Sequence, residues 1–377
     1  MNAVHAERLF DGQTIAPDRT VLIADGLVAG VSPGRQPGAV TVPLLAPGFI
    51  DIQVNGGGGV LLNDDPSPAA IARIAAAHRR FGTTGFLATL ISDSRARIAA
   101  AIGGVAAALA AGQPGLLGLH LEGPFLNPAR RGVHPAANIA TAGPQDVALL
   151  AGLGRRGRTL VTLAPERVPA GFIAQLVQHG VRVAAGHSLA GPAELARAVA
   201  EGLTGATHLY NAMSQMTARD PGLVGAVLAD DRVFAGIIAD GLHVAPEPLR
   251  VALKAKGAAR LMLVSDAMPP VGAAAAGGFD LMGTAVRVEG RRLLTGEGTL
   301  AGALLDMGAA VRHMVAAGGA SLEQALAMAS TTPASFLGLA DRLGAIRPGM
   351  RADLVALDER LGILATWIGG VMEGGQP

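Results

Sequence analysis

The sequence predicts an α/β fold, namely a (β/α)8 TIM-like barrel with a small β-sandwich domain built from the N- and C-terminal segments. Short β-like runs such as TVLIADG and ADLVALDE occupy the two ends of the chain. Between the ends, short apolar runs alternate with helical patterns. The 377 residues suffice for one large domain and a small accessory one. We expect residues 1–47 and 345–377 to form the β-domain, and residues 48–344 to form the barrel.

Eight apolar runs are candidates for the inner strands of this barrel. Most are continuously apolar, as expected of parallel strands that are buried on both faces. Eight such strands, each followed by a helix, are typical of a (β/α)8 barrel. The runs are residues 49–55, 84–91, 115–122, 159–165, 181–187, 205–211, 234–240 and 261–267.

Helical patterns between these runs begin and end at recognisable residues. The first has Ser67 as N-cap, Pro68 at its first position and Gly82 as a stop. Residues 191–202 and 246–257 share the proline start and the glycine stop. Residues 272–300 fit neither pattern, and we expect a loop and a β-hairpin there, acting either as a lid or as an ordinary insertion.

Composition excludes several classes of protein. The net charge is +1 without a long run of one sign, which argues against nucleic-acid and membrane partners. There are no cysteines, so any metal must be held by His, Asp or Glu. The N-terminus lacks the pattern of a secretory signal, so we expect a cytoplasmic protein. The uncharged stretch 98–119 is interrupted by GQPG, and we predict a buried helix, a turn and a strand there.

Polar residues recur at the C-terminal ends of the predicted strands, where barrel enzymes place their chemistry. Polar groups leaving buried strands cost free energy unless they are paired or ligated. Five strand ends with this feature therefore indicate a functional site. The residues are His120 and Glu122, then His187, then His208 and Asn211, then Asp240 and His243, and finally Asp266.

Two imidazoles and one carboxylate are a common catalytic zinc set, with the fourth position left for water. Glu122, His187 and His208 are therefore candidate metal ligands. Asp266 can be a ligand, an ion-pair partner or a base, and a carboxylate beside a metal-bound water suits proton transfer. His120 is either a hydrogen-bonded core residue or a support for the ligands.

Gln53 and Asn55 end the first run, at a place where many metal-dependent hydrolases carry His-x-His. Carboxamides are weak ligands for zinc-class ions compared with imidazole. We therefore expect one catalytic metal ion per subunit, with the two amides hydrogen-bonded in the vacated position of a second ion. Arg219 follows the sixth run and either binds an anion or pairs with Asp220.

Together these stretches resemble the amidohydrolase superfamily, and within it the family of N-acetylglucosamine-6-phosphate deacetylases. HLEGPF followed by GHS, THLYNAM and ADGLHV is specific to the deacetylases, whereas the tail GAIRPGMRADLVALD is typical of the superfamily only. The matching stretches span nearly the whole chain. Ser265 and Ala303 depart from the family pattern, which more usually has Thr and Ser there, and neither belongs to the metal set.

The resemblance implies hydrolysis of the acetamide of N-acetyl-D-glucosamine 6-phosphate by a metal-activated water, in amino-sugar catabolism or cell-wall sugar recycling. It implies Asp266 as the acid/base and Glu122, His187 and His208 as ligands of one divalent ion, with zinc favoured over iron, cobalt or manganese. It also implies that the protein is a homodimer and that it binds a small sugar phosphate. The residues that it places at the substrate are Val133, His134, Asn211, Ala212, Arg219, His243, Leu300, Ala301 and Gly302, of which Arg219 can reach across a dimer interface.

Two other functions stay open. One is an amidohydrolase acting on a different N-acyl or cyclic amide, in which Arg219, His134 and His243 have other roles. The other is a non-catalytic binder of sugar phosphates on a degenerate barrel, which the intact ligand set disfavours.

Overall fold

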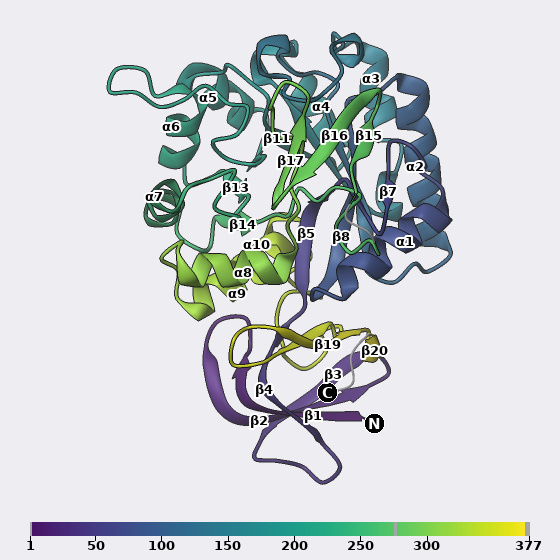
Figure 1. Cartoon of the computed structure of the whole chain (residues 1–377), viewed down its shortest axis with the longest axis vertical. Helices are drawn as coiled ribbons and strands as arrows, with labels where there is room; N and C mark the ends of the chain where they lie inside the picture. The colour runs from purple at the N-terminus through teal and green to yellow at the C-terminus, as the bar shows by residue number, and fades with distance from the viewer. Residues whose placement is uncertain (1, 275–276, 374–377) are drawn as a thin grey trace.

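Eight parallel strands form a barrel in the computed structural model, which describes residues 2–274 and 277–373 (Figure 1). The strands pair in chain order, and a parallel bridge between Val54 and Ala267 closes the barrel. The eight predicted runs are therefore the barrel strands, which confirms the fold class. These strands are β5 (Phe49–Val54), β8 (Thr83–Ile91), β9 (Leu116–Glu122), β10 (Arg158–Leu163), β11 (Arg182–Ala185), β12 (Gly205–Ala206), β13 (Phe234–Ile237) and β14 (Leu261–Leu263).

Helices surround the barrel, and their caps follow the predicted signals. The Ser67 side chain accepts a hydrogen bond from the Ala70 amide, and Pro68 opens the first helix. Gly257 ends another helix with a φ of 67°. No helix in the described part of the chain is long and apolar enough to cross a membrane. The helices are α1 (Pro68–Arg79), α2 (Arg95–Ala110), α3 (Pro144–Leu150), α4 (Phe172–Gln178), α5 (Pro192–Ala200), α6 (Gly222–Ala229), α7 (Pro246–Lys256), α8 (Met307–Ala316), α9 (Leu322–Ala329) and α10 (Thr331–Phe336).

Both ends of the chain form a second sheet below the barrel in Figure 1. Its order is β20-β19-β18-β4-β1-β2-β3, and only the pair β1–β4 is parallel among its described pairs. The edge residue Leu27 bridges Arg351 beside β18, so the sheet curls back on itself around its own apolar core. The predicted sandwich is thus one curled sheet. Its strands are β1 (Asn2–Phe10), β2 (Ile15–Ala24), β3 (Leu27–Pro33), β4 (Val40–Pro47), β18 (Leu354–Leu357), β19 (Ile363–Ile368) and β20 (Val371–Glu373).

The segment after β14 forms a three-stranded antiparallel sheet, one strand more than the predicted hairpin. It consists of β15 (Phe279–Leu281), β16 (Thr284–Glu289) and β17 (Arg292–Thr295). Leu281, Val286 and Leu293 are buried in one apolar cluster with Leu61, Ile91 and Met268. This insertion is therefore packed against the end of the barrel, beside the short hairpin of β6 (Gly56–Gly57) and β7 (Val60–Leu61).

Candidate active site

Three barrel strands end earlier than predicted because the backbone turns at polar residues. His187 has a φ of 49°, His208 of 35° and Asp266 of 51°. A positive φ is uncommon in residues other than glycine, and such conformations cluster at functional sites. The chain thus leaves the strand geometry near the two candidate histidine ligands and the candidate base, whereas the third candidate ligand, Glu122, is the last residue of β9.

Glu122, His187 and His208 converge at the C-terminal mouth of the barrel and are all buried. Glu122 Oε1 lies 3.1 Å from His187 Nε2 and 2.9 Å from His208 Nε2. The two Nε2 atoms are 3.0 Å apart. His187 Nδ1 lies 2.8 Å from the Arg130 carbonyl, so Nδ1 carries the proton and Nε2 has a free lone pair. The three side chains each offer one ligand atom to a shared point, which is the geometry of a metal site.

The electrostatics of this cluster favour a cation. Burial opposes the charge of Glu122, but its hydrogen bonds to His187 and His208 hold its pKa well below the usual value. Burial likewise opposes the charge of His208, yet Glu122 raises the pKa of His208. Burial first, and then the charge of Glu122, raise the pKa of Asp266 to about 6. Glu122 is therefore the ionised carboxylate, and Asp266 is poised to exchange a proton.

The side-chain amides of Gln53, in β5, and of Asn55, just after β5, act as hydrogen-bond donors. Gln53 Nε2 donates to Glu122 Oε1 at 3.2 Å and to Asp266 Oδ1 at 3.1 Å. Asn55 Nδ2 donates to the same Asp266 oxygen at 2.7 Å. Both amides therefore orient carboxylates through their NH2 groups, while Asn55 Oδ1 is buried without a described hydrogen-bond partner. Carboxamide oxygens are weak ligands for zinc-class ions compared with imidazole.

His134 lies beside the metal-ligand cluster, and one of its ring nitrogens already accepts a hydrogen bond from the protein. Its Nδ1 accepts a hydrogen bond from the Ser92 amide at 3.2 Å, so in the neutral ring Nε2 carries the proton. Burial, followed by the charge of His187, lowers the pKa of His134 well below its usual value. His134 is thus a neutral N–H donor whose ring lies 4.4 Å from that of His187, measured between centroids.

His243 is held by a carboxylate on its own loop. Its Nδ1 lies 2.7 Å from Asp240 Oδ2, and Asp240 Oδ1 accepts the amides of Leu242 and His243. These contacts fix the ring and leave Nε2 as the nitrogen available to a ligand.

A cavity of about 480 Å³ lies over these residues, within the roughly 300–1,000 Å³ typical of small-molecule sites. Most residues that the sequence predicted to contact metal or substrate border it. Ala301 is buried behind them, where its amide donates to the Leu293 carbonyl. Arg219 is exposed and does not border the cavity of its own chain. The predicted residues that border it are Glu122, Val133, His134, His187, His208, Asn211, Ala212, His243, Asp266, Leu300 and Gly302.

Two supporting residues were not singled out from the sequence. Glu166 accepts hydrogen bonds from Asn127, from the Ser188 hydroxyl and from the Leu189 amide, which ties two site loops together. Ser92 holds His134. Both residues come shortly after a barrel strand, Glu166 after β10 and Ser92 after β8. Polar residues at strand ends were the signal for the other site residues, so the same signal could have identified these two.

His120 belongs to a buried polar layer below the site. Its ring nitrogens lie 3.3 Å from Thr89 Oγ1 and 2.8 Å from Thr162 Oγ1. Burial, with a partly opposing contribution from Glu122, lowers its pKa to about 4. The structure thus favours the core interpretation of His120 over a direct role at the metal site.

Comparison with known proteins adds the following findings. The model of the Amidohydrolase family matches residues 44–372. The chain is 40% identical over 358 residues to the N-acetylgalactosamine-6-phosphate deacetylase of Shewanella sp. (strain ANA-3), covering 92% of this chain and 90% of that protein. It is 38% identical over 348 residues to the N-acetylglucosamine-6-phosphate deacetylase of Bos taurus, covering 87% and 82%. The crystal structure of N-acetylglucosamine-6-phosphate deacetylase from Pasteurella multocida matches with a TM-score of 0.94 at 30% identity, covering 99% and 100%.

Proposed function

Since the chain belongs to the amidohydrolase family, we propose that it hydrolyses the acetamide of N-acetyl-D-glucosamine 6-phosphate to D-glucosamine 6-phosphate and acetate. The observation that carries this proposal is the convergence of Glu122, His187, His208 and Asp266 on one cavity. Similar proteins named as deacetylases of N-acetylhexosamine 6-phosphates support the choice of substrate class.

Glu122, His187 and His208 would hold one divalent ion per subunit, with zinc favoured and iron, cobalt or manganese compatible with the same donor set. A divalent ion in this place lowers the pKa of a water molecule and polarises the acetyl carbonyl. The donor roles of Gln53 and Asn55 support a single ion, because their NH2 groups face carboxylates and carboxamide oxygens are weak ligands for such ions.

Asp266 would take a proton from the attacking water and return it to the leaving amine. Gln53 and Asn55 hold its Oδ1, which fixes the orientation of the carboxylate. His134 would donate its Nε2–H to the acetyl oxygen as negative charge develops there. The neutral state of His134 suits this role, since the ring keeps its donor without adding a cation to the site.

Asn211, Ala212, His243 and the segment 300–302 would bind the sugar phosphate, with Val133 against the acetyl group. In a homodimer, Arg219 would reach the phosphate group of the substrate that is bound to the second subunit. This assignment is supported by its exposure and by the lack of an ion pair to Asp220 among the described residues, since the Asp220 carboxylate accepts the Gly222 amide instead.

We also propose a division into domains. Residues 48–344 would form the catalytic barrel, and residues 1–47 and 345–377 the accessory domain. Residues 1, 275–276 and 374–377 of this division lie outside the described residues. The separate apolar core enclosed by the curled sheet supports this division.

N-acetylgalactosamine 6-phosphate is the second candidate substrate, because the Shewanella relative is named for it. Acetate release by the purified protein from both phosphorylated sugars, and from unphosphorylated N-acetylglucosamine, tests the proposal. Metal content is measured on the same sample. We expect release from a phosphorylated sugar only, and no release from either of them after metal reconstitution would overturn the proposed function.

A further inference from the structure

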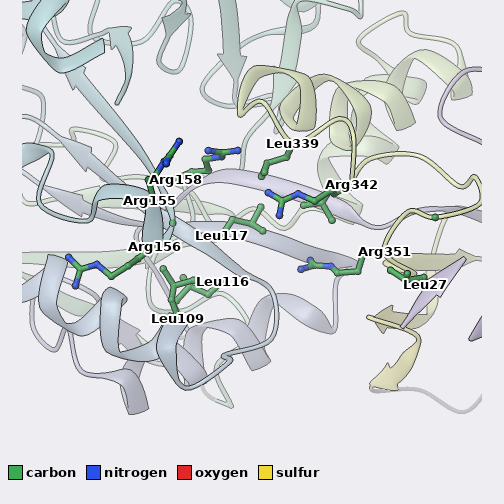
Figure 2. Close-up of a pocket in the computed structure, with 13 residues that line it drawn as sticks. Leu27, Leu109, Leu116, Leu117, Arg155, Arg156, Arg158, Leu339, Arg342 and Arg351 are labelled. Atoms are coloured by element: carbon green, nitrogen blue, oxygen red, sulfur yellow. The ribbon is translucent and has the colours of Figure 1, made fainter. Parts of the chain in front are cut away.

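Figure 2 shows the residues that line a second cavity, of about 440 Å³. This cavity lies at the end of the barrel opposite to the active site, because β9 and β10 border it with their N-terminal ends. Its walls are formed by the starts of β9 and β10, the turn before β10, Leu109 of α2, the segment after α10, Leu27 of β3 and Arg351 before β18. The cavity thus lies between the barrel and the curled terminal sheet, and its size is that of a small-molecule site.

The walls of this cavity combine arginine with leucine. Figure 2 shows arginine side chains around a group of leucines. Among the described residues that form the walls there is no Asp or Glu, although the whole chain has 30 basic and 29 acidic residues. The walls therefore carry a local excess of positive charge, although the chain as a whole is nearly neutral. The arginines are Arg155, Arg156, Arg158, Arg342 and Arg351, and the leucines are Leu27, Leu109, Leu116, Leu117, Leu339 and Leu343.

Three of the five guanidinium groups have hydrogen-bonded partners within the protein. Arg351 pairs with Asp353, Arg158 donates to the Gly338 carbonyl at 3.0 Å, and Arg156 donates to the carbonyls of Leu153 and Gly152. These contacts fix part of the wall and hold its shape.

The other two guanidinium groups are available to a ligand. Arg342 is 3.9 Å from the exposed carboxylate of Asp341, and Arg155 has no hydrogen bond or ion pair to any described residue. Burial mainly, and then repulsion from Arg158, lowers the pKa of the neighbouring Arg182, which does not itself line the cavity. An anion placed here would relieve that repulsion.

We propose that this cavity binds an organic phosphate, with the phosphate held by Arg155 and Arg342 and an apolar body lying on the leucines. Guanidinium groups bind phosphate oxygens through paired, charge-assisted hydrogen bonds. The buried Leu116, Leu339 and Leu343 supply the apolar surface that such sites usually have. The walls contain no nucleophile, acid or base suited to catalysis, so the ligand would be bound without being transformed.

The test is a calorimetric titration of the holoenzyme with adenosine 5′-monophosphate and with phenyl phosphate at low ionic strength. Both probes have a phosphate and a flat body, whereas inorganic phosphate, titrated in parallel, has only the former. Glucosamine 6-phosphate is present throughout to occupy the active site. We expect saturable binding of both organic phosphates at one site, and binding of inorganic phosphate that is weaker by about tenfold or more.

The double variant Arg155→Gln/Arg342→Gln should weaken the binding of both organic phosphates by at least about tenfold. The matched control is Arg8→Gln/Arg360→Gln, which removes the same charge from two exposed arginines outside the cavity walls. Circular dichroism and thermal unfolding of both variants verify that they fold. No saturable binding of either organic phosphate to the wild type, or equal binding by the two variants, overturns the proposal. The comparison of variants isolates this cavity whatever the active site binds, so its outcome is independent of the proposed function.

Discussion

Asp266 is held by two amide donors on one of its oxygens, and burial, followed by the charge of Glu122, raises its pKa. If it moves the proton in hydrolysis, Asp266→Asn should lower kcat by about 10²–10⁴-fold while the metal content stays unchanged. Steady-state kinetics and metal analysis of the same preparation measure both quantities. Ser265→Thr introduces the residue that is more usual in the family and should keep nearly full activity. Turnover of a metal-loaded Asp266→Asn protein near the wild-type rate would contradict the assignment.

Glu122 is the only carboxylate of the proposed ligand set, and it touches both ligand histidines. Glu122→Gln replaces an anionic ligand by a weak neutral one, so the metal content should fall from about one ion per chain to well below one after dialysis. His134→Gln, in the same cavity, should retain the ion because His134 is not among the ligands. A reproducible content of two ions per chain in the wild type, with both needed for activity, would contradict the single-ion site.

Helix α3 depends on one buried carboxylate. Asp146 accepts the Gly143 amide at 2.8 Å and a two-bond contact from Arg95 at 2.6 and 3.0 Å, which ties the starts of α2 and α3 together. Burial would raise the pKa of Asp146, but these contacts outweigh it and lower the pKa below the usual 3.8. The carboxylate therefore contributes stability fully above the unfolded pKa, and the contribution is lost as the pH falls through the folded value.

Asp146→Asn should lower the free energy of unfolding by about 1–2 kcal/mol at pH 7. The difference from the wild type should shrink below about pH 4, where the unfolded carboxyl group is protonated. Urea unfolding at both pH values measures this. Glu194→Gln, at the corresponding position of α5 and without a described hydrogen bond from an arginine, should cost less. An undiminished difference at low pH would show that the charge of Asp146 is not the cause.

The insertion β15–β17 is either a lid over the active site or an ordinary insertion, and a variant within it can distinguish the two. Leu293 is buried in the cluster that fixes this sheet, and residues 298–300, which follow β17, border the active-site cavity. Leu293→Ala removes contacts worth about 2–5 kcal/mol in a well-packed core. If the insertion closes over substrate, KM should rise several-fold and proteolysis within 277–300 should become faster. Leu294→Ala, on the opposite and less buried face, is the matched control. An unchanged KM with faster proteolysis would favour the ordinary insertion.

The elements differ in how well local sequence predicts them. Proline starts and glycine stops defined α1, α5 and α7 closely because capping is a local property. β12 has only two residues, five fewer than the predicted run 205–211, because the chain leaves the strand near His208. That early end depends on the assembled site. The third strand of the insertion and the curl of the terminal sheet likewise depend on contacts between distant segments.

At the scale of the molecule, the candidate metal site was predictable because a barrel brings all its strand ends to one face. Glu122, His187, His208 and Asp266 therefore meet although up to 144 positions separate them along the chain, from 122 to 266. Arg219 lies on an exposed loop that this rule does not place, and a single chain leaves it outside its own cavity. The proposed role of Arg219 requires a second subunit, and the pattern of one chain does not specify how subunits assemble.

Mixing of subunits tests whether Arg219 serves the neighbouring active site. Arg219→Ala and Asp266→Asn should each be nearly inactive as homodimers. A mixed dimer has one site with an intact Asp266 and with Arg219 supplied by the other subunit, because a two-fold interface is reciprocal. Unfolding and refolding the two variants together at equal concentrations should therefore recover about a quarter of the wild-type activity, since half the dimers are mixed and each has one complete site of two. If Arg219 served its own chain, both sites of a mixed dimer would be defective and no activity would return.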